Sequence, residues 1–128
     1  WSFIVIDDKE VLNHLAQVLP YAKMTAEAPM AIVVCGDLTK SLNGELGQYW
    51  MLDCSAASEN LLLAAEALGL GAVWTAVYPE EQRIENVRAV LSLPEYIVPF
   101  NLIPIGYPQR NEEPKDKFKQ ENIHYNQW

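Results

Sequence analysis

The run DCSAASENLLLAAEALGLGAVW, residues 53–74, decides how this chain folds. Residues 54–68 contain five polar side chains: Ser55, Ser58, Glu59, Asn60 and Glu66. Because a helix with so little polar surface cannot lie half exposed on a small domain, we expect it to be buried on all sides. A second copy of the chain could cover part of it by two-fold packing. A central helix in a monomeric core fits the same pattern equally well.

A glycine turn follows this helix. Gly69 and Gly71 flank Leu70, which is typical of a left-handed helix cap followed by a chain reversal. The chain then enters AVWTAVYP, a short apolar strand that ends at Pro79.

The rest of the chain alternates strands and helices around this unit. Periodicity and capping residues predict a buried strand over 2–6, a helix over 9–19 capped by Asp7 or Asp8, a buried strand over 31–35 and an amphipathic helix over 80–93. The stretch 38–48 has no sustained period and is interpreted as a loop or short helix. Residues 97–108 are strand-like but contain Pro99 and Pro104, which favours an interrupted or edge strand, with a central strand starting after Pro99 as the alternative.

Composition limits the function. A chain of 128 residues is about one domain, and half of its residues are hydrophobic. No apolar run approaches the roughly 20 residues that a membrane-spanning helix needs. The net charge of -8 argues against nucleic acid or an anionic membrane as the main partner. Cys35 and Cys54 lie in apolar contexts without metal-like spacing, so we interpret both as buried packing thiols of a cytoplasmic protein.

Several motifs, in order and spacing, resemble the flavin-dependent nitroreductase family. The segment WMLDCSAASENLLLAAEALGLGAVWTAVYP, residues 50–79, is similar to that family's central helix, glycine turn and strand. The motifs KDKF, residues 115–118, and IHYNQW, residues 123–128, resemble the tail of one of its branches. The resemblance covers essentially the whole chain. It implies an α+β fold, with a mixed or antiparallel sheet flanked by helices, in a homodimer centred on the helix over 53–68 with FMN between the subunits.

The resemblance also implies site residues. The backbone of Trp74, Thr75, Ala76 and Val77 would pass along the flavin ring near its reactive edge. The C-terminal extension, residues 109–128, would dock on the partner subunit and bring Lys115 and Lys117 to the flavin phosphate, where ammonium groups donate charge-assisted hydrogen bonds.

The substrate pocket is expected at Tyr49 and Trp50, which follow the loop that lies over the partner's flavin in the family. The alternative is that both are core aromatics at the start of the long helix.

The implied reaction is ping-pong transfer of two electrons from NAD(P)H through FMN to a nitroaromatic, a quinone or a similar electron-poor acceptor. No Ser, His and Asp triad is evident, and His14 and His124 have no metal-like partners in sequence. We therefore assign no catalytic side chain and no metal, which suits an enzyme whose cofactor carries the reaction.

The start of the chain leaves two further hypotheses open. It begins at Trp1 in a β-like run, so we expect a single domain over 1–128 that lacks the family's N-terminal helices and their Arg-x-Ser-x-Arg phosphate grip. One hypothesis is therefore a non-catalytic dimeric or flavin-sequestering module. The other is a different flavin reaction on the same scaffold, such as dehalogenation or flavin fragmentation.

Overall fold

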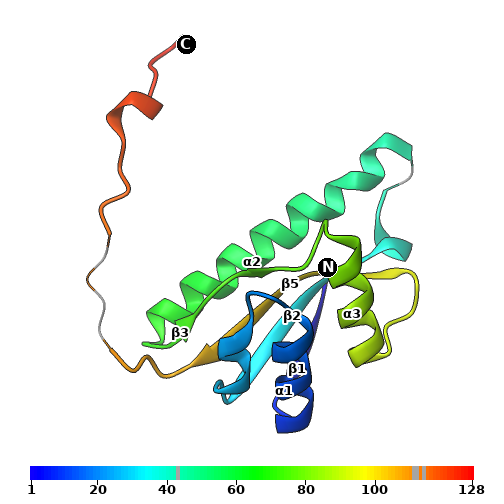
Figure 1. Ribbon diagram of the computed structural model, residues 1–128. Coiled ribbons are helices and arrows are strands. Elements are labelled where there is room, and N and C mark those ends of the chain that lie inside the picture. Colours follow the sequence, from blue (N-terminus) through cyan, green and yellow to red (C-terminus); the bar gives the residue numbers. More distant parts are fainter. Residues whose placement is uncertain (43, 111–112, 114) are drawn as a thin grey trace.

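The computed structural model describes residues 1–42, 44–110, 113 and 115–128, with the backbone alone for residues 44–46. Its centre is an antiparallel sheet in the order β1-β2-β5-β3, with β4 also paired to β5 (Figure 1). The strands are β1 Ser2–Ile6, β2 Met30–Asp37, β3 Gly71–Ala72, β4 Thr75–Ala76 and β5 Ile97–Gly106. The α-helices are α1 Lys9–Val18, α2 Trp50–Ala67 and α3 Glu81–Leu91. The predicted α+β fold with an antiparallel sheet is confirmed.

Helices cover both faces of the sheet. The long helix α2 lies along one face, while α1 and α3 pack against the other. The α1 side buries Leu12, Leu15, Val33, Val77, Val87 and Leu102, and the α2 side buries Val34, Cys54, Phe100, Ile103 and Ile105. Asp8 caps α1 as predicted, because its side chain accepts hydrogen bonds from the amides of Glu10 and Val11.

The strand β5 is central, so the prediction of an edge or interrupted strand is wrong. It runs continuously between β2 and the short strands β3 and β4. Each proline lies where no ladder donor is needed. Pro99 lies at a register shift opposite Cys35. The nitrogen of Pro104 faces the break between β3 and β4, where neither strand pairs with β5. The alternative, a central strand starting after Pro99, has the correct position in the sheet but the wrong start, because β5 begins at Ile97.

The helix α2 is not buried on all sides within the single chain, so the alternative of a central helix in a monomeric core is wrong, while burial against a second copy stays a prediction. Its fully buried residues are Cys54, Ser58 and Ala65. On the opposite side Leu52 is 65%, Leu63 59% and Leu68 74% exposed. We call this side the α2 stripe; it contains Leu52, Ala56, Glu59, Asn60, Leu63, Ala64, Ala67 and Leu68, all exposed. The sheet covers only one side of α2, which an apolar pattern in the sequence cannot reveal.

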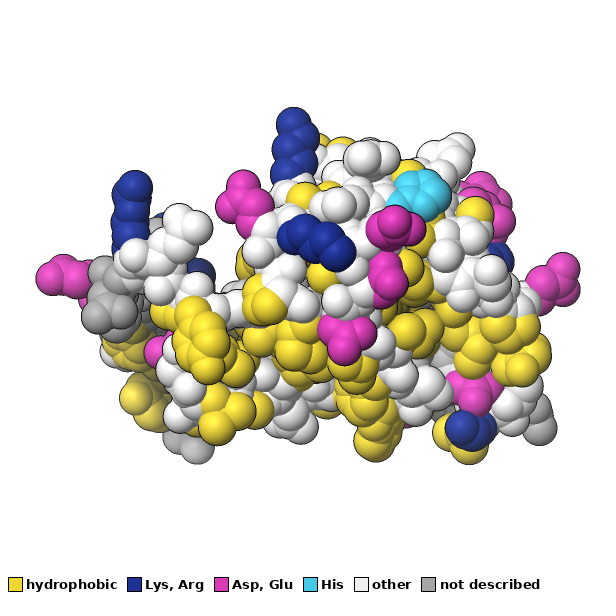
Figure 2. All heavy atoms as spheres, turned by 90° about the horizontal axis from the view of Figure 1, so that it is seen from below, with side chains coloured by type: hydrophobic (Ala, Val, Ile, Leu, Met, Phe, Trp, Pro, Cys, Tyr) yellow, Lys and Arg dark blue, Asp and Glu magenta, His cyan; other side chains and the backbone are white. Residues whose placement is uncertain are grey.

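Beyond Gly106 the chain leaves the body and runs away from it (Figure 1). Most side chains of the tail are exposed, including Phe118, Tyr125 and Trp128. Within the tail the rings of His124 and Trp128 stack with centroids 4.2 Å apart. On the body as well, hydrophobic side chains reach the surface over much of the face in Figure 2, with acidic groups scattered between them. Of the helices in the described ranges, none combines the length and hydrophobicity of a membrane span.

Candidate functional site

The segment predicted to line a flavin ring, residues 74–77, lies at an open edge of the sheet. Strand β4 pairs with β5 on one side, and among the described residues no strand pairs with its other side. The amide of Val77 donates to the carbonyl of Phe100 over 3.2 Å. Because antiparallel strands alternate groups that face the neighbour with groups that face away, the N–H and C=O of Ala76 point away from β5. The edge therefore presents backbone groups to whatever lies beside it.

An aromatic cluster adjoins this edge. Phe100 is its centre, with ring centroids 5.5 Å from Trp74, 6.0 Å from Trp50 and 6.1 Å from Tyr78. The rings of Trp50 and Tyr78 also meet edge to face at 5.0 Å. Trp50 and Trp74, which are far apart in sequence, are thus brought together through Phe100. The cluster gives the edge a rigid apolar wall.

Trp50 is held in this cluster by contact with a glycine. A Cβ atom at Gly36 would lie 2.8 Å from Cδ2 of Trp50, so the indole packs directly on the backbone of β2. Tyr49, the preceding residue, is 52% exposed. Of the two predicted pocket residues, Trp50 is therefore part of the packed core and Tyr49 presents its ring to the surface.

The turn after β2 is fixed by Asp37. Its carboxylate accepts hydrogen bonds from the hydroxyl of Thr39 at 2.6 Å and the amide of Thr39 at 3.1 Å, and it pairs with the ammonium of Lys40 at 3.0 Å. These donors, the Thr39 hydroxyl first, hold the pKa of Asp37 below its usual range. The carboxylate therefore stays charged and anchors the start of the loop that leads to Tyr49.

A buried polar pair lies between α2 and the sheet. Asn101, in β5 beside Ala76, donates from Nδ2 to Oγ of Ser58 over 2.8 Å. Ser58 in turn donates to the carbonyl of Cys54 over 2.7 Å. Both side chains are fully buried, and Oδ1 of Asn101 has no hydrogen-bond partner among the described residues. The pair fixes the position of α2 over β5, the strand with which β4 pairs.

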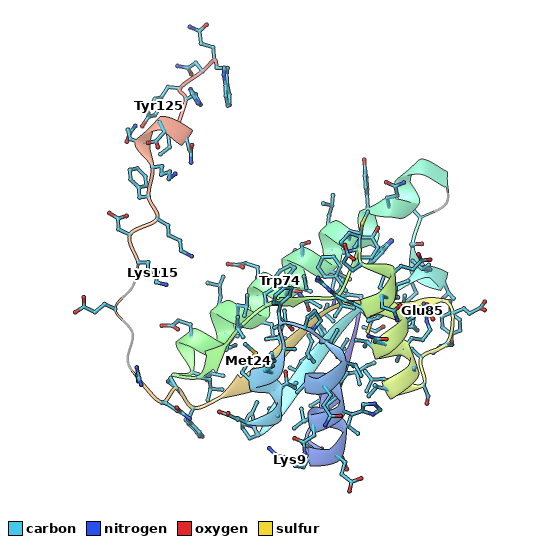
Figure 3. The ribbon with its side chains drawn as sticks, viewed as in Figure 1. Lys9, Met24, Trp74, Glu85, Lys115 and Tyr125 are labelled. Carbon is cyan, nitrogen blue, oxygen red and sulfur yellow. The ribbon has the colours of Figure 1, made fainter. Side chains whose placement is uncertain are left out.

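The two predicted phosphate ligands are not brought to this edge within one chain. Lys115 and Lys117 are exposed in the tail, and Figure 3 shows Lys115 well away from Trp74. The structure thus assembles the aromatic and backbone part of the predicted site but not its basic part.

Sequence reasoning did not single out Tyr78, Phe100, Asn101 or Arg83 at this site. The sequence could have pointed to Tyr78 and Phe100, since both are aromatic residues in predicted strands. It could have pointed to Asn101 as well, because Asn101 is an amide inside an apolar run. Arg83 donates from Nη1 to the carbonyl of Ala76 over 3.3 Å. A basic residue in an amphipathic surface helix gave no reason to expect that contact.

The two cysteines are packing thiols, as predicted. Both have no exposed surface, and neither forms a disulfide. Burial raises the pKa of Cys35 to about 12 and that of Cys54 to about 11. Both thiols are therefore protonated at neutral pH and are not nucleophiles.

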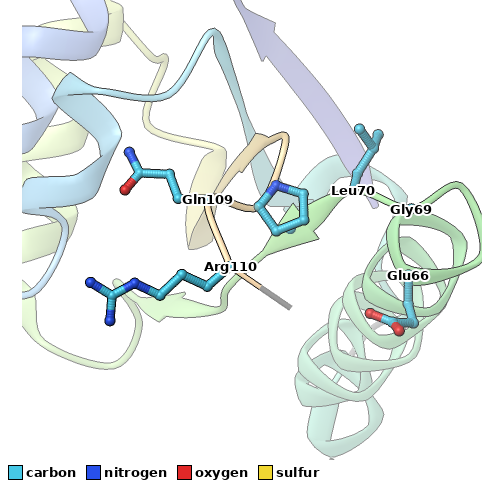
Figure 4. Close-up of a pocket in the computed structure, with 7 residues that line it drawn as sticks. Glu66, Gly69, Leu70, Gln109 and Arg110 are labelled. Carbon is cyan, nitrogen blue, oxygen red and sulfur yellow. The ribbon is translucent and has the colours of Figure 1, made fainter. Parts of the chain in front are cut away.

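A separate hollow of about 700 Å³ lies where the tail leaves the body, at the far end of α2 (Figure 4). Glu66, Gly69 and Leu70 form one wall, and Gln109 and Arg110 form part of the other. None of its lining residues belongs to the segment 74–77. The path of the tail shapes this hollow, so we do not place the chemistry there.

Apolar side chains beside a few fixed polar groups are suited to proteins in which a bound cofactor carries the reaction and the protein positions it. Residues 1–107 match the model of the nitroreductase family. The chain belongs to the nitroreductase family.

Relatives of known sequence and structure agree with this assignment. A Methanothermobacter thermautotrophicus protein with the provisional name NADH dehydrogenase/NAD(P)H nitroreductase is 48% identical over 128 residues, all of this chain and 65% of that protein. The chain thus spans slightly less than two thirds of that relative. A Parabacteroides distasonis crystal structure with the same provisional name is 55% identical, with a TM-score of 0.92 over 100% of this chain and 73% of its own. An FMN-dependent nitroreductase from Clostridium difficile is 28% identical, with a TM-score of 0.89 over 100% and 76%.

Proposed function

We propose that this protein is a cytoplasmic oxidoreductase that uses FMN to transfer two electrons from NAD(P)H to a small electron-poor acceptor. Membership of the nitroreductase family supports the proposal, as do the NAD(P)H and FMN in the names of its relatives. The observation that carries it is the open edge at Ala76 beside an aromatic wall, on the segment that the family resemblance assigns to the flavin ring.

The residues at this edge fit the ring of FMN. An isoalloxazine ring needs an apolar slot and a few fixed polar groups at its rim. Trp74 and the ring of Phe100 supply the apolar side. The N–H of Ala76 supplies a donor that is not used by the sheet. The backbone of Trp74, Thr75, Ala76 and Val77 would therefore hold and orient the ring.

The phosphate of FMN needs fixed positive charge, and the body of one chain does not bring it to this edge. Lys115 and Lys117 lie in a tail that runs away from the body (Figure 3). We propose that the tail, residues 109–128, docks on a second copy and that its two lysines bind the phosphate there. The exposed apolar side chains of Phe118, Ile123, Tyr125 and Trp128 give the tail surface to bury in such a contact.

We also propose that a second copy of the chain covers the α2 stripe. Exposed leucines and alanines line one side of α2 over its whole length. We propose that they are buried between two copies related by a two-fold axis, in which each tail reaches the other copy's edge strand. The proposed protein is therefore a homodimer whose two sites each need residues from both chains.

The chemistry that FMN supplies when bound is ping-pong transfer of two electrons from NAD(P)H to a nitroaromatic, a quinone or a similar acceptor. The residues of the chain bind and orient the reactants. The aromatic wall would exclude water from one side of the ring. Tyr49, which is 52% exposed, is our candidate for contact with the acceptor. No side chain is assigned the transfer of a proton.

The test is an absorbance spectrum of the purified protein with added FMN. We expect bound flavin whose visible absorbance bleaches on addition of NADH or NADPH and returns on addition of a nitroaromatic or a quinone. A colourless dimer that gains no activity with FMN would support a non-catalytic module instead. Bound flavin that is reduced but reacts with neither acceptor would support a different flavin reaction, which product analysis would identify.

A further inference from the structure

Arg83 lies where three elements meet at the open edge. It belongs to the first turns of α3, and its Nη1 donates to the carbonyl of Ala76 in β4 over 3.3 Å. Its guanidinium carbon lies 5.4 Å from the centre of the ring of Tyr21, just beyond the end of α1, within the range of a cation–π contact. The side chain is thus fixed between an aromatic face and the backbone of the edge strand.

The contact with Ala76 is made on the side of β4 that faces away from the sheet. The carbonyl that accepts from Arg83 and the free N–H of Ala76 belong to the same residue, and both point to the open edge. On its inner side the strand is held by the Thr75 hydroxyl on the Leu102 carbonyl and by the amides of Val77 and Tyr78 on the Phe100 carbonyl. On the outer side, the hydrogen bond from Arg83 is made to the carbonyl of the same residue whose N–H faces the open edge.

Arg83 also brings a positive charge to this edge. Among the described residues it forms no ion pair, in contrast to Arg88, which pairs with Glu85 on the same helix. The chain as a whole carries a net charge of -8. The guanidinium of Arg83 therefore opposes the general negative field at the edge, and a positive charge favours the more electron-rich state of a ring bound beside it.

We propose that Arg83 is a positioning residue of the flavin site: it orients the N–H of Ala76 toward the ring and raises the reduction potential of the bound cofactor. This inference rests on the proposed function, because it assumes that FMN binds along residues 74–77.

The test compares Arg83→Met, which removes both the hydrogen bond and the charge, with Arg83→Lys, which keeps the charge. The matched control is Lys23→Met, which removes one exposed positive charge from the 3-10 turn Lys23–Ala26. Three quantities are measured: the dissociation constant for FMN, the reduction potential of bound FMN, and the hydrogen exchange rate of the Ala76 amide in the FMN-free protein.

Arg83→Met is expected to weaken FMN binding by about tenfold, which corresponds to about 1.4 kcal/mol. It should also lower the reduction potential and speed exchange at Ala76. Arg83→Lys should keep the potential near that of the wild type. A purely structural role would not produce this difference between Met and Lys. Lys23→Met should leave all three quantities unchanged.

Wild-type values of all three quantities in Arg83→Met would overturn the inference, as would equal potentials in the Met and Lys variants. If the wild type itself binds no FMN, the proposed function fails together with the claim on the potential. The hydrogen exchange rate of the Ala76 amide, compared between the FMN-free wild type and Arg83→Met, then still decides whether Arg83 orients the N–H of Ala76.

Discussion

At the scale of single residues, the proposed site depends on two lysines that lie outside the body of the chain. Replacing Lys115 and Lys117 together by alanine should raise the dissociation constant for FMN by tenfold or more, because hydrogen bonds to charged groups contribute about 1.5–3 kcal/mol each. The measurement is titration with FMN followed by fluorescence. The dimer should persist, because the substitutions leave the α2 stripe intact.

The control for this pair removes the same charge elsewhere. Lys23→Ala with Lys119→Ala takes one lysine from the body and one from the same tail. It should leave the affinity for FMN close to that of the wild type. Equal affinities in the wild type and the Lys115 and Lys117 double variant would remove both lysines from the site.

The buried cysteines predict how stability depends on alkaline pH. Folding raises their pKa values from about 9.0 to about 12 for Cys35 and about 11 for Cys54. The folded state therefore holds protons that the unfolded state releases. This contribution to stability is fully present below pH 9 and is lost as the pH rises toward 11 and 12.

The measurement is the free energy of unfolding in denaturant at pH 8 and pH 10, for the wild type and for Cys35→Val with Cys54→Ala. Because tyrosines and lysines titrate in the same range, the difference between the two proteins isolates the thiols. We expect the wild type to lose more stability than the variant between the two pH values. A parallel loss in both proteins would contradict the assignment.

At the scale of elements, the hydrogen bond between Ser58 and Asn101 joins α2 to β5. Ser58→Ala should destabilise the fold by about 1–3 kcal/mol, because it leaves a buried amide without its acceptor. Combining it with Asn101→Leu removes both polar groups and should restore much of this loss. Denaturant unfolding of the wild type, both single variants and the double variant completes the cycle. Strictly additive effects would show that the hydrogen bond contributes no coupling between the two elements.

Local patterns predicted most elements well. The strand β1 has its predicted bounds, and α1 and α3 differ from theirs only at their ends. The predicted burial of β1 is wrong, because β1 is an edge strand in which Phe3 is 48% and Val5 62% exposed. Capping, periodicity and proline are local signals, so a single sequence carries them.

Where pairing between distant residues matters, the sequence was less informative. The prolines in β5 indicated an edge, because the sequence does not show that β3 and β4 leave a break opposite Pro104. The single apolar run over 72–79 became two separate short strands for the same reason.

At the scale of the whole molecule, the sequence predicted an apolar helix but not what covers it. One side of α2 packs on the sheet, and the α2 stripe remains exposed in the single chain. Likewise, the aromatic half of the predicted site is assembled within one chain through Phe100, while the lysines stay in the tail. The apolar pattern of this helix fits burial against a second copy and burial in a monomeric core equally well, so the homodimer is a proposal.

The α2 stripe makes the proposed dimer testable. Ala64 is exposed in the protomer, so Ala64→Glu should leave the chain folded. In a dimer that packs along the α2 stripe, the same carboxylate would be buried without a partner, which is costly. We therefore expect sedimentation to show a folded monomer, with an unchanged circular dichroism spectrum.

The matched control is Ala89→Glu, which places the same group on the exposed side of α3 and should not affect assembly. A dimer that survives Ala64→Glu would place the interface elsewhere on the molecule.

The break between β3 and β4 has a consequence for how this scaffold can diversify. Val73 and Trp74 form no ladder with β5, so even a proline at either position would remove no ladder hydrogen bond. Their neighbours on both sides stay registered on the central strand. Selection can therefore reshape this rim residue by residue, while the architecture underneath is inherited unchanged.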